Sequence, residues 1–120
     1  MGITKLGNLI LDKAISSGYN EYVEPIFQDK SLDRLETDPY FDGGHPSEVV
    51  KAFRKRMQQI RAAPDERVFY SQRSLRFERL AGARKHQSSM RLNDQWRLIL
   101  EFRGSGSDKK VAIIGIEDYH

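Results

Sequence analysis

The chain has 120 residues, of which 38% are hydrophobic and 31% charged, a composition that excludes a disordered protein and allows one domain with a modest core. Cysteine is absent, which excludes disulfides and thiolate metal sites and suits a reducing cytosol. No apolar run approaches the roughly 18 residues of a membrane-spanning helix, and His45, His86 and His120 lack the spacing of a zinc site.

The net charge of +3 hides an asymmetry between the two parts of the chain. Residues 1–50 hold nine acids and four bases, a net charge of −5, whereas residues 51–120 hold sixteen bases and eight acids, a net charge of +8. A basic part joined to an acidic part indicates a surface that faces a polyanion. Solvated helices that carry Lys and Arg would give the same charges, so charge alone leaves both interpretations open.

Residues 1–23 carry a loosely helical pattern of apolar residues that stops at a Ser-Ser-Gly sequence. The apolar positions are Ile3, Leu6, Ile10 and Ala14. We interpret residues 1–23 as an N-terminal extension, either helical or disordered, ahead of a single domain over residues 24–120. No residue of the extension carries recognisable chemistry.

A helix is predicted from Pro46 to Ala62, after a loop over residues 38–44 that contains one proline and two glycines. Pro46 suits a first helical turn, and Glu48 complements the positive end of the helix dipole. An apolar stripe requires this helix to pack on a sheet and consists of Val49, Val50, Phe53, Met57 and Ile60. The other faces carry Lys51, Arg54, Lys55, Arg56 and Arg61. Contact with RNA phosphates and an ordinary solvated surface both explain these charges, and the pattern alone slightly favours the solvated surface.

Two short apolar pieces follow the helix, at residues 68–70 and 75–77. They lead into residues 80–86, whose sequence is Leu-Ala-Gly-Ala-Arg-Lys-His. This stretch predicts a basic loop with a glycine, placed directly before the next element.

An antiparallel hairpin is predicted over residues 90–102, where two alternating apolar runs flank a short polar break. A three-residue loop, Asn93 to Gln95, pairs Leu92 with Trp96 and Met90 with Leu98, which puts both apolar sets on one face. The core face then carries Met90, Leu92, Trp96, Leu98, Leu100 and Phe102. Trp96 is accordingly expected to be a core residue rather than a platform for stacking.

The same register places Arg91 directly opposite Arg97 on the other face. Like charges that face each other across a ladder destabilise a sheet by about 0.2–1 kcal/mol. The pair therefore indicates an anion site, since an arginine is permanently charged and can bind phosphate with two hydrogen bonds.

A third strand is predicted over residues 111–116, which are rich in β-branched side chains, after a flexible connection over residues 104–108. The expected pairs are Arg103 with Lys109 and Arg97 with Gly115, and the expected core residues are Ala112 and Ile114. A glycine beside two arginines would leave room for a ligand. By alternation, Tyr119 falls on the side of the arginines, and His120 follows it.

Three stretches of the sequence together resemble the HigB-type host-inhibition toxins, or plasmid maintenance killer proteins, of the RelE superfamily. They are Leu-Ala-Gly-Ala-Arg at residues 80–84, Ser-Met-Arg-Leu-Asn-Asp-Gln-Trp-Arg-Leu at residues 89–98, and Glu-Asp-Tyr-His at residues 117–120. The resemblance covers residues 25–120 and also implies a short first strand over residues 24–28 with a helical turn behind it. The implied fold is RelE-like and α+β, with a small antiparallel sheet of about four strands, including a C-terminal meander, packed against N-terminal helices.

The resemblance implies a cytoplasmic toxin that enters the 30S A site of the ribosome and cleaves translated messenger RNA. It implies a HigA-like helix-turn-helix antitoxin as partner, operator DNA binding only through that antitoxin, and no cofactor or metal. The expected catalytic residues are Arg91, Arg97, Tyr119 and His120. The expected RNA-binding residues are Arg79, Arg84, Lys85 and His86.

The expected chemistry uses the 2′-hydroxyl of RNA, which is already adjacent to the phosphate. Arg91 and Arg97 would stabilise the developing charge, while His120 is the best acid or base because its ordinary pKa lies near 6.5. Many relatives carry a histidine and a lysine where this chain has Glu78 and Ala81. That departure keeps two alternatives open: a catalytically weak binding module of the same fold, and a basic accessory protein without nuclease activity.

Overall fold

The structure is a computed structural model that describes residues 23–105 and 108–119. It contains three α-helices within those ranges, α3 (Lys30–Thr37), α4 (Ser47–Ala62) and α5 (Arg67–Ser71). Five strands form one sheet in the order β1-β5-β4-β3-β2. The strands are β1 (Glu24–Phe27), β2 (Glu78–Arg79), β3 (Ser88–Arg91), β4 (Trp96–Arg103) and β5 (Lys110–Asp118). Two short 3-10 turns, η1 (Arg73–Leu75) and η2 (Gly82–Arg84), flank β2.

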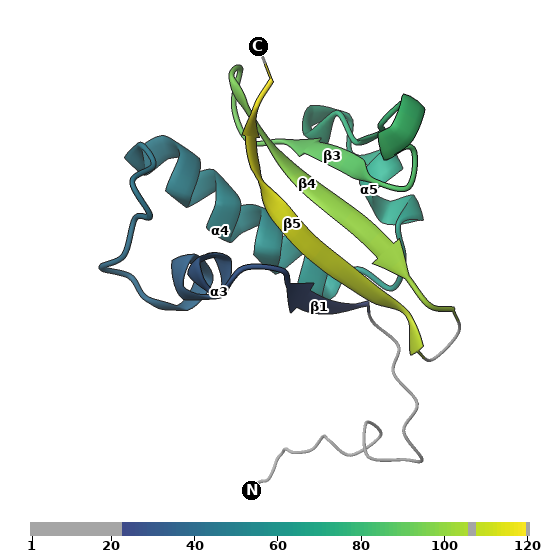
Figure 1. Cartoon of the computed structure of the whole chain (residues 1–120), viewed down its shortest axis with the longest axis horizontal. Coiled ribbons are helices and arrows are strands. Elements are labelled where there is room, and N and C mark those ends of the chain that lie inside the picture. The colour runs from purple at the N-terminus through teal and green to yellow at the C-terminus, as the bar shows by residue number, and fades with distance from the viewer. Residues whose placement is uncertain (1–22, 106–107, 120) are drawn as a thin grey trace, which may run out of the picture.

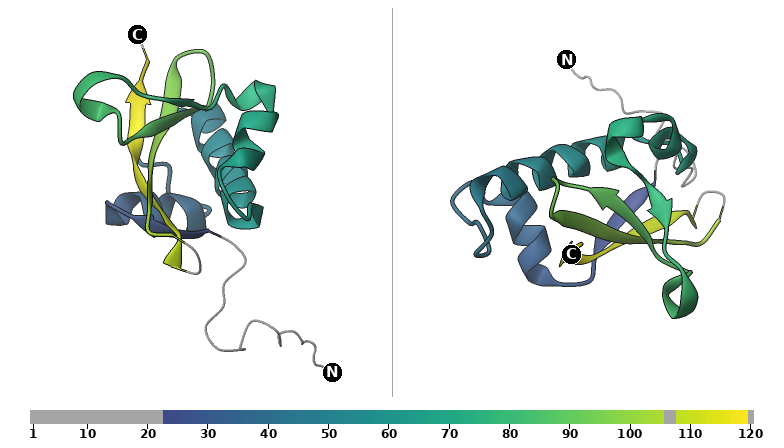
Figure 2. Two further views of the ribbon diagram at one scale, coloured as in Figure 1. Left: turned by 90° about the vertical axis from the view of Figure 1, so that its right-hand side faces the viewer. Right: turned by 90° about the horizontal axis from the view of Figure 1, so that it is seen from above.

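The architecture confirms the predicted α+β class and makes the sheet mixed rather than purely antiparallel. Strand β1 pairs with β5 in parallel, whereas the other neighbouring strands are antiparallel. Helices α4 and α5 cover the same face of the sheet, and α3 lies beside the β1 edge (Figures 1 and 2). The predicted extension over residues 1–23 lies outside the described residues except for Val23, which is buried in the core.

Helix α4 packs its apolar stripe on the sheet, as its sequence predicts. Val49, Val50, Phe53, Met57 and Ile60 are all buried. They meet the inward side chains of the central strands, which include Met90, Leu98, Leu100, Val111 and Ile113. Full burial of a side chain of this size stabilises a fold by roughly 1.5–3 kcal/mol. This contact is therefore the main apolar support of the sheet.

The β3–β4 hairpin has the predicted register. Met90 pairs with Leu98, and Arg91 pairs with Arg97. The Asn93 side chain explains the turn, because its Oδ1 accepts hydrogen bonds from the backbone N–H groups of Gln95 at 2.9 Å and Trp96 at 2.8 Å. Trp96 is half-buried against the core, in agreement with its predicted structural role.

The predicted register of β5 is wrong. Arg103 pairs with Lys110 rather than Lys109, and Arg97 pairs with Glu117 rather than Gly115. The cause is an irregularity between Ile99 and Leu100, where β5 passes from Ile113 to Gly115 and leaves Ile114 without a direct partner.

This extra residue changes which side chains of β5 face the core. Val111 and Ile113 belong to the main core cluster, and beyond the bulge Ile116 packs against it. The predicted Ala112 is buried as well, outside that cluster, whereas the predicted Ile114 is only half-buried. Alternation resumes after the bulge, so Tyr119 still lies on the side of the arginines, as predicted, with its ring centroid 4.7 Å from Cζ of Arg97. Gly115 lies opposite Ile99 rather than Arg97, and the space above its Cα is open.

Candidate functional site

The predicted arginines meet at the end of the sheet where β3 ends, β4 begins and β5 ends, which is the end nearest the C-terminus in Figure 1. A cavity of about 170 Å³ opens there. It is lined by Arg76, Arg91, Asn93, Asp94, Arg97 and Tyr119. We call Arg76, Arg91 and Arg97 the arginine cluster. Three guanidinium groups and one phenol around a small cavity suit an anion with several oxygen atoms.

Arg97 lines this cavity and is only 5% exposed. Its Nε donates to Oγ of the buried Ser89 at 3.0 Å, and its Nη2 donates to the backbone carbonyl of Arg76. Burial lowers the pKa of the Arg97 guanidinium, and the negative charge of Glu78 opposes that shift. An arginine nevertheless stays protonated in a protein, so Arg97 is a fixed positive charge held by neutral oxygen atoms.

Arg91 lies at the side of the cavity, with its side chain 34% exposed and paired with the exposed carboxylate of Asp94. The backbone below it is fixed from α4, because Nε of Arg56 donates to the Arg91 carbonyl at 3.0 Å. Burial lowers the pKa of the Arg56 guanidinium, and the charge of Arg91 lowers it further. Arg56 therefore supports the site from below, a position that the basic pattern of the helix could not assign.

Arg76 is a cavity residue that the sequence analysis missed. It follows η1 in the left-handed region, with φ 47° and ψ 46°, and is the one non-glycine residue with positive φ among those described. Its carbonyl holds Arg97 while its exposed side chain lines the cavity. The sequence indicates only a short apolar piece over residues 75–77, since both neighbours of Arg76 are apolar. Nothing in that pattern indicates the backbone conformation that brings Arg76 to the site.

Tyr119 covers Arg97 and is 55% exposed. Its ring contacts the Arg97 guanidinium, and its hydroxyl donates to Oε2 of Glu78 at 3.3 Å. Its backbone N–H donates to the Gln95 carbonyl at 2.6 Å, which fastens the end of β5 to the hairpin turn. The Glu78 carboxylate therefore lies beside Tyr119, whose ring contacts Arg97. His120, the other predicted residue of the tail, lies outside the described residues.

A second cavity of about 210 Å³ adjoins the first on the other side of Tyr119. Arg97 and Tyr119 line both cavities, and the second also includes Arg84 and Glu117. The Arg84 guanidinium makes two hydrogen bonds to the Glu117 carboxylate, at 3.0 and 2.8 Å, and these raise the pKa of Arg84. We call these two residues the Arg84–Glu117 pair. The structure therefore brings the predicted Arg84 close to the arginine cluster, with a carboxylate already bound.

The remaining predicted RNA-binding residues lie farther out. Arg79, Lys85 and His86 are exposed, and none of them lines either cavity. Nε2 of His86 lies 3.7 Å from Oε1 of Glu101, farther along β4. These three residues form an outer basic rim around β2 and η2.

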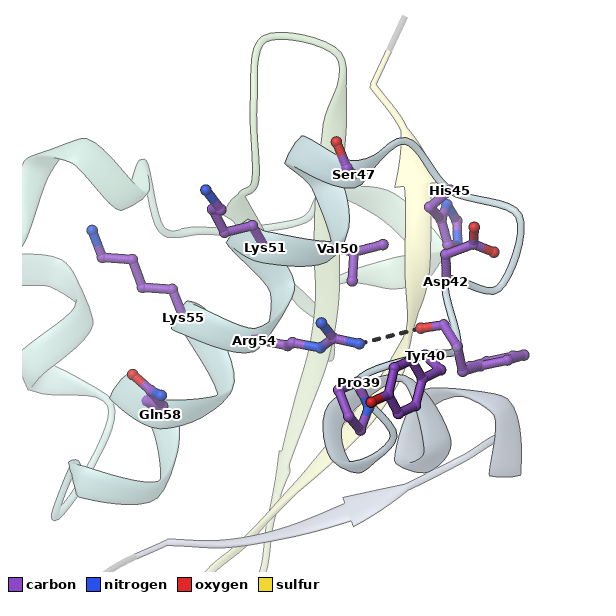
Figure 3. A pocket seen from close by; sticks show the side chains of 11 residues that line it. Pro39, Tyr40, Asp42, His45, Ser47, Val50, Lys51, Arg54, Lys55 and Gln58 are labelled. Carbon is purple, nitrogen blue, oxygen red and sulfur yellow. Dashed lines mark hydrogen bonds between the residues drawn. The ribbon is translucent and has the colours of Figure 1, made fainter.

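A cavity of about 610 Å³ lies elsewhere (Figure 3). It lies between α4 and the loop over residues 38–46, and none of the predicted site residues lines it. Arg54 is committed to structure there, because it donates to the carbonyls of Leu35, Asp38 and Phe41. Figure 3 shows its guanidinium turned toward that loop, with Lys51 and Lys55 farther from it.

No group of three or more His, Cys, Asp or Glu side chains in residues 23–105 and 108–119 is arranged to hold a metal ion. Within the same ranges, no helix is long and apolar enough to cross a membrane.

Comparison with known proteins gives a family match over residues 25–120. The family is described as the RelE-like toxin of the type II toxin-antitoxin system HigB. No curated protein matches the chain. Among solved structures, the chain is similar to a YoeB/ParE toxin from Agrobacterium tumefaciens, with 16% sequence identity and a TM-score of 0.56, over 82% of this chain and 100% of that one. The structural likeness confirms the predicted RelE-like fold and, at that identity, nothing beyond the fold.

Proposed function

The chain belongs to the HigB-like family of RelE-like toxins from type II toxin-antitoxin systems, and from this premise we propose that it is a ribosome-dependent endoribonuclease that cleaves translated messenger RNA. The observation that carries the proposal is the pairing of Arg91 with Arg97 across the hairpin, where both line one small cavity with Tyr119. Placing two like charges opposite each other is unfavourable unless an anion joins them. A phosphodiester of RNA fits that requirement.

The proposed reaction uses the RNA as its own nucleophile. The 2′-oxygen attacks the adjacent phosphorus, the bond from phosphorus to the 5′-oxygen breaks, and the products are a 2′,3′-cyclic phosphate and a 5′-hydroxyl. The 2′-hydroxyl proton goes to a base and the leaving 5′-oxygen receives a proton. No metal or cofactor is needed to balance these steps.

Each predicted catalytic residue has a part in that scheme. Arg97 and Arg91 stabilise the charge that develops on the pentacoordinate phosphate. His120 transfers a proton, and Tyr119 positions the RNA by stacking or by hydrogen bonding. Glu78 supplies a second candidate base, since its carboxylate already accepts a hydrogen bond from Tyr119 in this structure.

RNA outside the cavity is assigned to the outer basic rim together with Arg84. Arg79, Arg84, Lys85 and His86 would contact flanking phosphates, and these contacts supply affinity without choosing a sequence. Arg84 must first exchange the Glu117 carboxylate for phosphate.

A type II toxin has an antitoxin as its partner, and we propose that this one is a HigA-like helix-turn-helix protein. The toxin would act in the cytoplasm at the 30S A site and would meet operator DNA only through the antitoxin. Activity would then be controlled by the antitoxin rather than by a small ligand.

One observation favours a second function, a catalytically weak module that acts by occupying the A site or as a co-repressor. The family resemblance implies a histidine and a lysine at the positions where this chain has Glu78 and Ala81. The Glu78 carboxylate also lies within hydrogen-bonding distance of Tyr119, where a negative charge opposes phosphate binding. An occupying module needs only the arginines, whereas a nuclease also needs proton transfer.

Mapping of RNA 5′ ends in a reconstituted translation reaction separates these functions. We expect cuts within A-site codons of a translated message, and none in the same message when initiation is blocked. Arrest of ribosomes without cuts would replace the nuclease by the occupying module. Cuts in the untranslated message would contradict the dependence on the ribosome. Arg103→Ala is a suitable control variant because it removes an arginine from the far end of β4 that pairs with Glu101 instead.

A further inference from the structure

Arg76 occupies a backbone conformation that costs energy for any residue with a Cβ atom. Its φ of 47° and ψ of 46° lie in the left-handed region, which glycine and asparagine adopt far more readily than arginine. The neighbouring residues fix this conformation, because the side chains of Leu75 and Phe77 are both buried in the core. Phe77 is further held between aromatic rings, with centroid distances of 5.4 Å to Phe69 and 6.2 Å to Phe102.

The backbone of Arg76 positions Arg97. Its carbonyl accepts a hydrogen bond from Nη2 of Arg97, which together with the Ser89 hydroxyl fixes the orientation of that guanidinium. A glycine in place of Arg76 would make the same carbonyl contact at lower conformational cost. The carbonyl contact therefore gives no reason for an arginine at this position.

The Arg76 side chain is the unoccupied cation of the cluster. Its exposed guanidinium lines the cavity with Arg91 and Arg97. Arg91 is paired with Asp94, and Arg84 is paired with Glu117. In the part of the chain that the structure describes, the Arg76 guanidinium has neither a hydrogen bond nor an ion pair. The Arg76 guanidinium therefore repels the guanidinium of Arg97, and no carboxylate is bound to Arg76 to offset that repulsion.

We propose that Arg76 is a phosphate-binding residue of the cluster, whose side chain contacts the phosphodiester backbone of the bound RNA beside the group held by Arg97. This inference rests on the proposed function for the identity of the ligand. An RNA phosphate supplies the anion that Arg76 lacks, and Arg76 adds a contact that the family resemblance did not assign. The contact reads no base, so it strengthens binding for every sequence alike.

The test uses Arg76→Gly, which removes the guanidinium, keeps the carbonyl that positions Arg97 and suits the left-handed backbone. The matched control is Arg73→Ala, which removes an exposed arginine from the adjacent turn η1 that does not line either cavity. The probe is a ribosome programmed with a message whose A-site codon carries 2′-O-methyl groups, so that binding is measured without cleavage. Arg76→Lys keeps the charge and serves as the conservative variant.

We expect Arg76→Gly to weaken binding about 10- to 100-fold, as expected for loss of one hydrogen-bonded charge. The slope of log affinity against log salt should fall by about 0.7, the value for one phosphate contact in single-stranded RNA. The unfolding midpoint should stay equal or rise, since glycine relieves the backbone. Arg76→Lys should restore the salt slope, and Arg73→Ala should change binding less than about twofold. Unchanged affinity and salt slope in a folded Arg76→Gly protein would overturn the proposal.

A second probe separates this proposal from the proposed function. Wild-type protein and Arg76→Gly are titrated with a 2′-deoxy dinucleotide, which carries one phosphodiester and needs no ribosome. Weaker dinucleotide binding by the variant would support the Arg76 contact. Failure of the wild type to bind programmed ribosomes would contradict the ribosome-directed function and would leave this result for Arg76 unchanged. Equal dinucleotide binding by both proteins would contradict the Arg76 contact.

Discussion

Arg97 and Arg84 line the same small cavity beside Tyr119, yet their surroundings differ. Arg97 is buried, and its guanidinium bonds the neutral oxygens of Ser89 and Arg76. The Arg84 side chain is 46% exposed and makes two hydrogen bonds to the Glu117 carboxylate. One arginine keeps its full charge available in a fixed position, whereas the other is already neutralised.

This difference indicates separate roles for the two arginines in binding and catalysis. A charge held by neutral oxygens needs no rearrangement when an anion arrives, which is the property that stabilises a transition state most effectively. A charge paired with a carboxylate must first release it, and the net gain from the exchange is small because an exposed ion pair is worth only about 0–1 kcal/mol. We therefore expect Arg97 to act in catalysis and Arg84 to act in binding.

The largest effect is expected from Arg97→Ala. Loss of the fixed charge should reduce the cleavage rate about 10²- to 10³-fold, the usual cost of removing one donor to a developing charge. The variant should also lose about 1–3 kcal/mol of unfolding free energy, because Ser89 and the Arg76 carbonyl lose a buried partner. Single-turnover cleavage and urea unfolding measure the two effects. Arg103→Ala, on the same strand, should leave the cleavage rate nearly unchanged.

Arg91→Ala should have a smaller effect than Arg97→Ala. Arg91 shares the cavity, but its side chain is one-third exposed and already paired with Asp94. A loss of about 10- to 100-fold in cleavage is expected from one charge-assisted contact of about 1.5–3 kcal/mol, with little change in unfolding free energy. A loss equal to that of Arg97→Ala would mean that burial does not distinguish the two arginines.

Arg84→Ala should raise the concentration of RNA at which cleavage is half-maximal by about fivefold, a loss of roughly 1 kcal/mol in binding free energy. The cleavage rate at saturating RNA should stay within about threefold of wild type. Titration of programmed ribosomes against the cleavage rate separates these quantities. A lower saturated rate with unchanged half-saturation would place Arg84 in catalysis and erase the contrast with Arg97.

The smallest effect is expected from Glu117→Gln, which keeps the size of the side chain and removes its charge. Freed from the carboxylate, Arg84 should bind RNA more tightly, by no more than about fivefold, because the lost pair is worth about 0–1 kcal/mol. Binding measured at low salt should show the gain most clearly, since salt screens exposed charges. Weaker binding by Glu117→Gln would mean that the pair holds Arg84 in its productive orientation.

The sequence predicted those parts of the molecule that depend on local pattern. The hairpin register followed from apolar alternation around the Asn93 turn, and it placed Arg91 opposite Arg97. The stripe of α4 followed from helical spacing. Local patterns also placed Tyr119 on the arginine side, although by an argument with the wrong β5 register.

The parts that the sequence did not reveal depend on single residues in unusual conformations. The bulge at Ile114 adds one residue to β5, and alternation cannot detect it because Ile113, Ile114 and Ile116 are all apolar. The left-handed backbone of Arg76 has no signal in a run of ordinary residues. The same backbone conformation brings the Arg76 carbonyl to the buried Arg97, a contact that the sequence pattern does not indicate. The pairing of Arg84 with Glu117 in turn required the true arrangement of β5.

Single-turnover cleavage on programmed ribosomes tests whether Arg97 is a fixed charge of the cleaving site while Arg84 serves binding. Arg97→Ala and Arg84→Ala are compared with wild type at saturating toxin, with folding of each variant checked by urea unfolding. We expect a rate at least about 100-fold lower for Arg97→Ala and a rate within about threefold of wild type for Arg84→Ala. A folded Arg97→Ala protein that cleaves at the wild-type rate would contradict a catalytic role for Arg97.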